Sequence, residues 1–180
     1  CFTASWIFYL QKDKQKIEIQ SKLCYSVLIV FCYEKMFMSN FAFLQAYWPD
    51  FANTLDFAEK YVYSDPASSK NKSGLFVELM VREIMRIENI PELEDAKDNN
   101  HYTRTKILKS EGLLPYDVNQ WINQVRIKRN DSAHANIACE QDAISVLSFT
   151  YHIAVWFMQT YGEADFKPDG FVNPVPPKKK

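Results

Sequence analysis

The sequence predicts an all-α fold, a bundle of four to five helices, and two features carry this prediction. After residue 38 the apolar residues recur at spacings of three and four, which is the period of a helix face, and no strand-like alternation is evident. The 180 residues include only 4 glycines, which is few for a chain with many tight turns. A hydrophobic content of 47% is sufficient for one globular domain with a core.

The first helix is predicted to begin at Pro49, because proline suits the first turn of a helix and Asp50 favours its positive end. Apolar residues then follow on one helix face: Phe51, Leu55, Ala58 and Val62. Asp65 is a good N-cap and Pro66 a good first residue, so a second helix is expected to start there.

This second helix is predicted to run from Pro66 to about Glu88. Its expected apolar stripe consists of Leu75, Leu79, Met80, Ile84 and Ile87. Four basic residues lie mostly off that stripe and predict a solvated face: Lys70, Lys72, Arg82 and Arg86. The acidic, polar stretch 91–100 predicts a surface loop.

Three further helices are predicted downstream. One spans 102–110 and is ended by Gly112, and the next starts at Pro115 and Asp117. The apolar face of that helix is expected to comprise Val118, Trp121, Ile122 and Val125, with a break after Arg129. The last helix is predicted over 138–161, capped by Asn136 or by the pair Asp131–Ser132. This helix is apolar almost all round, which indicates a central position or an interface.

The chain is divided by composition into three parts. Residues 1–37 hold three of the four cysteines and no glycine or proline. We hypothesise that the functional protein starts at Met38. The alternative is that residues 1–37 form a short strand or helix packed on the domain. Residues 38–162 form the predicted helical domain, and residues 163–180 a proline-rich linker or tail. The longest apolar run, 24–33, is too short to span a bilayer, so a cytoplasmic protein without membrane contact is expected.

Most enzyme motifs are missing from the sequence. It contains no phosphate-binding loop, dinucleotide fingerprint, nucleophile elbow or zinc pattern, so neither a metal site nor a cofactor is predicted. The net charge of -1 argues against bulk attraction to nucleic acid, although a local basic patch remains compatible with it.

The segment from Arg129 to His134 is the strongest candidate for chemistry. Arginine holds phosphate with a planar fork of donors, and histidine titrates near neutral pH. If a break at Asn130–Asp131–Ser132 turned Arg129 and His134 to one side, they could cleave RNA without a metal. The alternative without chemistry is that Arg129 is a cation at the end of one helix and His134 a polar residue at the start of the next.

Two resemblances converge on this segment. Arg129-Asn130-x-x-x-His134 resembles the Arg-polar-x-x-x-His signature of the HEPN superfamily, which are all-helical domains. That likeness implies that Arg129 and His134 are catalytic, that Asn130 assists them, and that two copies form a homodimeric, metal-independent ribonuclease.

Residues from about 40 to 134 are similar to a helical domain of unknown function at the N terminus of type I restriction enzyme R subunits and related helicases. The resemblance is carried by Asn40-Phe41-x-Phe43-Leu44, Trp48-Pro49-Asp50, Ala58-Glu59, Asp65-Pro66 and Asn130-x-x-Ala133-His134. In that domain a glycine commonly occupies the position of Arg129, and Arg126 matches its earlier arginine.

The resemblance implies an accessory module of a restriction-modification or related anti-phage system, which binds RNA, DNA, other subunits or a fused helicase domain. Arg126, Lys128 and Arg129 are the expected nucleic-acid-binding residues. The alternatives are a stand-alone homodimeric HEPN ribonuclease and a purely structural interaction domain.

Overall fold

The computed structural model describes residues 39–92, 100–135 and 139–177, and for 131–135 it describes the backbone alone. The predicted extension 1–37 and the start at Met38 lie outside these residues. All regular structure in the described part is helical, which confirms the all-α prediction. The elements in order are η1 (Ala42–Leu44), α2 (Pro49–Tyr61), α3 (Pro66–Ile87), α4 (His101–Ser110), α5 (Tyr116–Ala135), α6 (Glu140–Phe157) and the π-helical turn η2 (Met158–Gly162).

The helix starts and stops follow the local signals in the sequence. The Asp65 carboxylate accepts the backbone N–H of Ser68 at 3.0 Å and caps α3, as predicted. At the start of α4, the Asn100 side chain accepts the N–H of Thr103 at 3.0 Å. Gly112 ends α4 with a φ of 74°, a left-handed conformation that favours glycine.

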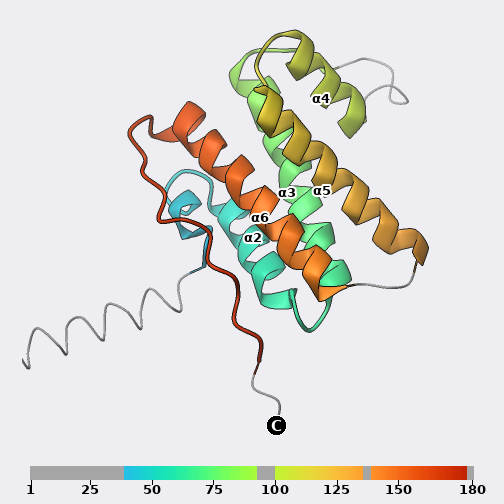
Figure 1. Ribbon diagram of the computed structural model, residues 1–180. Helices are drawn as coiled ribbons and strands as arrows, with labels where there is room; N and C mark the ends of the chain where they lie inside the picture. Colours follow the sequence, from blue (N-terminus) through green and yellow to red (C-terminus); the bar gives the residue numbers. More distant parts are fainter. Residues whose placement is uncertain (1–38, 93–99, 136–138, 178–180) are drawn as a thin grey trace, which may run out of the picture. The chain divides into compact units, whose positions relative to one another are not determined.

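Helix α3 is central, because it contacts α2, α4, α5 and α6 (Figure 1). The predicted stripe is only partly right: Met80 and Ile84 are buried, but Leu75 is 37% exposed. The buried face instead comprises Ser69, Lys70, Ser73, Gly74, Phe76, Val77, Met80, Val81, Ile84 and Met85. A helix covered from several sides buries more than one stripe, so periodicity in the sequence cannot select its face.

One of the four basic residues assigned to a solvated face of α3 is buried. The side chain of Lys70 is only 2% exposed, whereas Arg82 and Arg86 are exposed as predicted. Lys70 lies in the first turns of α3, and at 2% exposure its ammonium group is covered together with its aliphatic stem.

The predicted break in α5 is wrong, because the helix continues from Tyr116 to Ala135. Asn, Asp and Ser have modest helix propensities, but none breaks an established helix as proline does. Asp131 and Ser132 thus lie within α5, and the other predicted cap, Asn136, lies outside the described residues. The N-cap of the last helix is Cys139, without a side-chain hydrogen bond. Helix α6 is largely buried, as its apolar sequence predicted, and contacts both α3 and α5 (Figure 1).

The segment after η2, which the sequence suggested as a linker, packs on the domain through residue 174. The Phe166 ring lies 4.8 Å from that of Phe43, and the Tyr63 hydroxyl donates to the Pro174 carbonyl at 2.6 Å. Proline excludes helix here, while the aromatic side chains between the prolines supply apolar contact area.

A hydrogen-bonded group joins the start of the domain, helix α2 and the C-terminal segment. We call it the terminal clasp, and its residues are Ser39, Asn40, Glu59 and Val172. The Glu59 carboxylate accepts the Ser39 hydroxyl at 2.7 Å and the Asn40 backbone N–H at 3.0 Å. The Asn40 amide then pairs with both backbone groups of Val172, at 2.9 Å and 2.8 Å. Burial raises the pKa of the Glu59 carboxyl, because the charged form is poorly solvated.

Candidate functional site

The helical backbone separates the two residues that the sequence paired. Arg129 and His134 are five positions apart on the continuous helix α5, which places them about 140° apart around its axis. The side chain of His134 is outside the described part of the chain. The joint action of Arg129 and His134 on one phosphate required a break in the helix, and the continuous helix α5 does not provide one.

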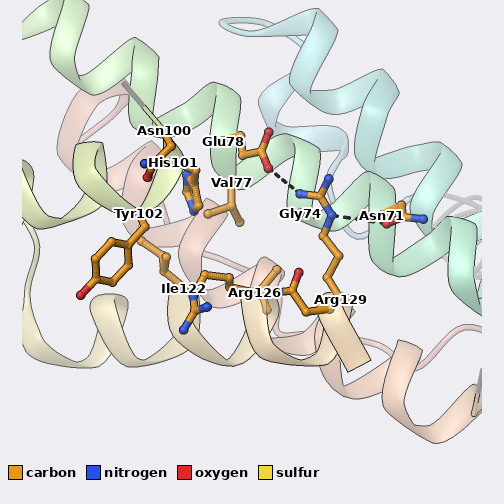
Figure 2. A pocket seen from close by; sticks show the side chains of 12 residues that line it. Asn71, Gly74, Val77, Glu78, Asn100, His101, Tyr102, Ile122, Arg126 and Arg129 are labelled. Atoms are coloured by element: carbon orange, nitrogen blue, oxygen red, sulfur yellow. Dashed lines mark hydrogen bonds and ion pairs between the residues drawn. The ribbon is translucent and has the colours of Figure 1, made fainter. Parts of the chain in front are cut away.

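Arg129 is instead fixed against α3. Its Nη1 donates to the Glu78 carboxylate at 2.5 Å, and its Nε donates to the Asn71 side-chain oxygen at 3.3 Å. Figure 2 shows the arginine rising from α5 and crossing Gly74 to reach these two residues. About a third of each charged side chain remains exposed, so the pair contributes only about 0.2–1 kcal/mol to stability.

Gly74 is what allows this approach. A Cβ added at Gly74 would lie 2.6 Å from Cδ of Arg129 and 3.0 Å from its Nη1. Any side chain larger than hydrogen would therefore force the arginine to move. An interior helical glycine costs about 0.5–1 kcal/mol relative to alanine, and here it gives Arg129 a route across α3.

Arg129 and its neighbours line a cavity of about 460 Å³ between α3, α4 and α5 (Figure 2). Its residues are Asn71, Gly74, Val77, Glu78, Asn100, His101, Tyr102, Ile122, Val125, Arg126, Arg129 and Asn130. We call it the inner cavity. Its apolar liners Val77, Ile122 and Val125 are each 1% exposed and form its floor.

A second cavity, of about 230 Å³, adjoins the first along α4 and α5. We call it the outer cavity. Four residues are common to both: His101, Tyr102, Ile122 and Arg126. Lys106 and Lys109 of α4 also line the outer cavity. The charged residues around the two cavities are therefore four cations and one carboxylate, Glu78, although the whole chain has a net charge of -1.

His101, the first residue of α4, was not among the candidates from the sequence. Burial lowers the pKa of its imidazole, and three arginines act in the same direction, whereas Glu78 opposes them. His101 is therefore held neutral near physiological pH. The sequence offered one unused signal for this site, a glycine inside the strongly periodic α3 pattern, because such a glycine often marks a close approach.

The other residues that the sequence selected lie as follows. Arg126 lies in the wall between the cavities, and Asn130 lines the inner one and is exposed. Lys128 points elsewhere and donates to the Asp142 carboxylate of α6 at 2.5 Å, which lowers the pKa of that carboxyl. The structure thus brings Arg126, Arg129 and Asn130 to one cavity, whereas Lys128 joins α5 to α6.

Neither a membrane-spanning helix nor a metal cluster was found where the structure describes the chain. None of the helices in residues 39–92, 100–135 and 139–177 is long and apolar enough to cross a bilayer. Among the same residues, no group of three His, Cys, Asp or Glu side chains is placed to hold a metal ion.

Comparison with known proteins places the domain in a family. No curated protein and no solved structure matches the chain. A family model described as "Domain of unknown function (DUF4145)" matches residues 56–174, from the middle of α2 through the docked C-terminal segment. Since this match covers more than half of the 180 residues, the chain belongs to the DUF4145 family of domains of unknown function.

Proposed function

We propose that this domain binds the phosphate backbone of nucleic acid along the two adjoining cavities between α4 and α5, as an accessory module. The observation that carries the proposal is the local charge: Lys106, Lys109, Arg126 and Arg129 line the two cavities with only one carboxylate, Glu78, among the described residues, in a chain of nearly neutral net charge. Such a concentrated basic surface attracts a polyanion even when the whole protein does not.

The surroundings of these cations suit a strand of nucleic acid. Tyr102, at the junction of the two cavities, is 62% exposed and offers a ring on which an unpaired base can stack. Asn119 and Asn123 line the outer cavity and Asn130 the inner one, so amide groups accompany the cations. These groups favour binding of backbone and base faces without strong sequence readout.

The biological setting of this binding is also a proposal. The resemblance of residues 40–134 to the N-terminal domain of restriction-linked helicases supports an accessory role in a restriction-modification or related anti-phage system. In that role the partners besides nucleic acid would be other subunits of the system or a fused helicase domain. The domain would hold nucleic acid for those partners.

The test is an anisotropy titration of labelled single-stranded RNA and DNA at about 50 and about 200 mM salt, a range over which binding through phosphate contacts weakens strongly. Arg126→Gln should weaken binding of all sequences and reduce the slope of log K against log salt by about one. The matched control is Arg82→Gln, which removes one exposed cation from α3 outside both cavities. Absence of binding at low salt, or equal losses in both variants, would refute the proposal.

A second candidate is a metal-independent ribonuclease, which one observation favours: Arg129 and Asn130 line the same cavity as a histidine, His101. A cation and a neutral imidazole in one cavity are the minimum for moving a proton at a bound phosphate. Incubation of the protein with RNA in EDTA discriminates the two functions. Cleavage that disappears in both Arg129→Ala and His101→Ala would replace the binding-module proposal with this one.

A further inference from the structure

Two residues that line the inner cavity each have a buried nitrogen atom without a hydrogen-bond partner in the described part of the chain. Nε of Arg126 and Nδ1 of His101 are both inaccessible, and neither has a hydrogen-bond partner among the residues that the structure describes. A buried polar group without a partner costs about 1–3 kcal/mol, and native proteins rarely leave one unexplained. The Arg126 nitrogen can only donate, so the group that suits it is an acceptor.

The backbone around these atoms also favours an acceptor with negative charge. Asn100, His101 and Tyr102 line the cavity and are the N-cap and the first two residues of α4. The unpaired N–H groups and the dipole at a helix N-terminus favour an anion. The positive end of α4 and the Arg126 guanidinium therefore contribute to the same cavity.

The charged groups that act on His101 come from its own helix, α4, and from α3 and α5. They are Glu78 of α3, Arg104 of α4, and Arg126 and Arg129 of α5. Arg129 is engaged by Glu78, and Arg104 lies 3.4 Å from the Glu92 carboxylate, so Arg126 contributes the charge that has no carboxylate partner among the described residues. An incoming anion would both pair with Arg126 and stabilise the protonated imidazole.

We propose that the inner cavity is a pocket for one phosphoryl group, held by Arg126 and by His101 at the start of α4, and that His101 takes up a proton when the group binds. The assignment of a natural ligand rests on the proposed nucleic-acid function. The phosphoryl group then belongs either to an internal phosphodiester or to the terminal phosphate of a strand. The chemistry of the pocket is the same for both sources.

Proton uptake gives the pocket a distinctive pH dependence. In the free protein, burial and the arginines lower the pKa of His101 and so favour its neutral form. A bound dianion favours the imidazolium, so affinity should increase as the pH falls, by up to about tenfold per pH unit between the pKa values of the free and bound states. Inorganic sulfate is a suitable probe because its own charge does not change over this range.

The experiment is an NMR titration of the histidine ring nitrogens with sulfate between pH 5.5 and 8, a window of roughly two units around the ordinary histidine pKa. The His101 resonances, assigned by their loss in His101→Gln, should shift toward the imidazolium pattern on saturation, while His152, on α6, serves as an internal control. Arg126→Gln should abolish the response, and Arg82→Gln should preserve it. A response of His101 equal to that of His152, or an affinity independent of pH, would overturn the proposal.

Matched RNA oligonucleotides with a 5′-phosphate or a 5′-hydroxyl then distinguish the two sources. Equal shifts of His101 indicate an internal phosphodiester, and shifts only with the phosphorylated strand indicate an end. The two proposals also fail separately. If sulfate shifts His101 but Arg126→Gln leaves nucleic-acid binding unchanged, the pocket stands and the proposed function falls. If nucleic acid binds through these cations but sulfate leaves His101 unmoved, the pocket falls.

Discussion

Replacement of Gly74 by alanine tests the geometry of the inner cavity through stability alone. Alanine in a helix interior is favoured over glycine by about 0.5–1 kcal/mol. The new Cβ would, however, lie 2.6 Å from Cδ of Arg129 and displace that side chain from Glu78. Loss of this partly exposed pair costs about 0.2–1 kcal/mol, so Gly74→Ala should leave the free energy of unfolding nearly unchanged.

The same substitution has a different effect when Arg129 is absent. An Arg129→Ala background removes the closest contacts of the added methyl group, because the three atoms nearest to it all belong to Arg129. Gly74→Ala should then stabilise the protein by the full propensity gain of about 0.5–1 kcal/mol. The difference between the two backgrounds is the coupling energy of a double-mutant cycle, which is expected to be of similar size.

Urea denaturation of the four proteins, followed by circular dichroism, measures this coupling. Thermal melting gives an independent estimate, since about 1 kcal/mol corresponds to a shift of about 2–8 °C for domains of this size range. An equal stabilisation by Gly74→Ala in both backgrounds would mean that Arg129 does not lie over Gly74. It would also remove the structural reason for placing Arg129 in the inner cavity.

Two further predictions concern ionisable groups away from the cavities. Because burial raises the pKa of Glu59 above its ordinary value of 4.5, its effect on stability is most favourable below that value and is lost as pH rises through the folded-state pKa. Urea titrations should therefore show wild type losing stability relative to Glu59→Gln as the pH increases above about 4.5, and a flat difference would contradict the burial of this carboxyl. Lys128→Met should cost only about 0–1 kcal/mol, and the loss should vanish as acid protonates Asp142, since the pair is partly exposed. Its nucleic-acid affinity should fall less than that of Arg126→Gln, and the opposite order would mean that Lys128 leaves Asp142 to bind the ligand.

The sequence predicted those parts of the fold that depend on neighbouring residues. Asp65 and Pro66 start α3, and Gly112 ends α4, because caps and turns are determined by a few adjacent side chains. The buried face of α2 was also predictable, since only one side of that helix meets the core. Helix α3 was harder because several helices cover it, so burial extends beyond any single stripe and includes Lys70.

The candidate site could be predicted only in part. Arg126 and Arg129 were selected from the sequence, and both line the inner cavity. The partner expected for Arg129 was His134, only five residues away, whereas its observed partner Glu78 is 51 residues away. His101 joins the arginines through the packing of α4 on α3, which no local spacing in the sequence reports.

Residues that carried the family resemblance also received physical roles that the sequence did not suggest. Asn40 and Glu59 take part in the terminal clasp, and the Trp48 ring packs, tilted, with its centre 4.4 Å from that of Phe157 at the end of α6. None of these residues lines either cavity. These residues of the resemblance therefore contribute to the packing of the fold and not to the cavities.

The terminal clasp has a mechanical consequence. Asn40 and Val172 are 132 residues apart in sequence, yet the two hydrogen bonds between them connect the first and last parts of the domain directly. Tension applied between the two ends would be borne first by these bonds and by the Tyr63–Pro174 contact, through α2, before α3, α4 or α5 is loaded. The helices that form the cavities therefore remain unstrained until the clasp opens, so a pull on the chain would release the C-terminal segment while the cavities keep their shape.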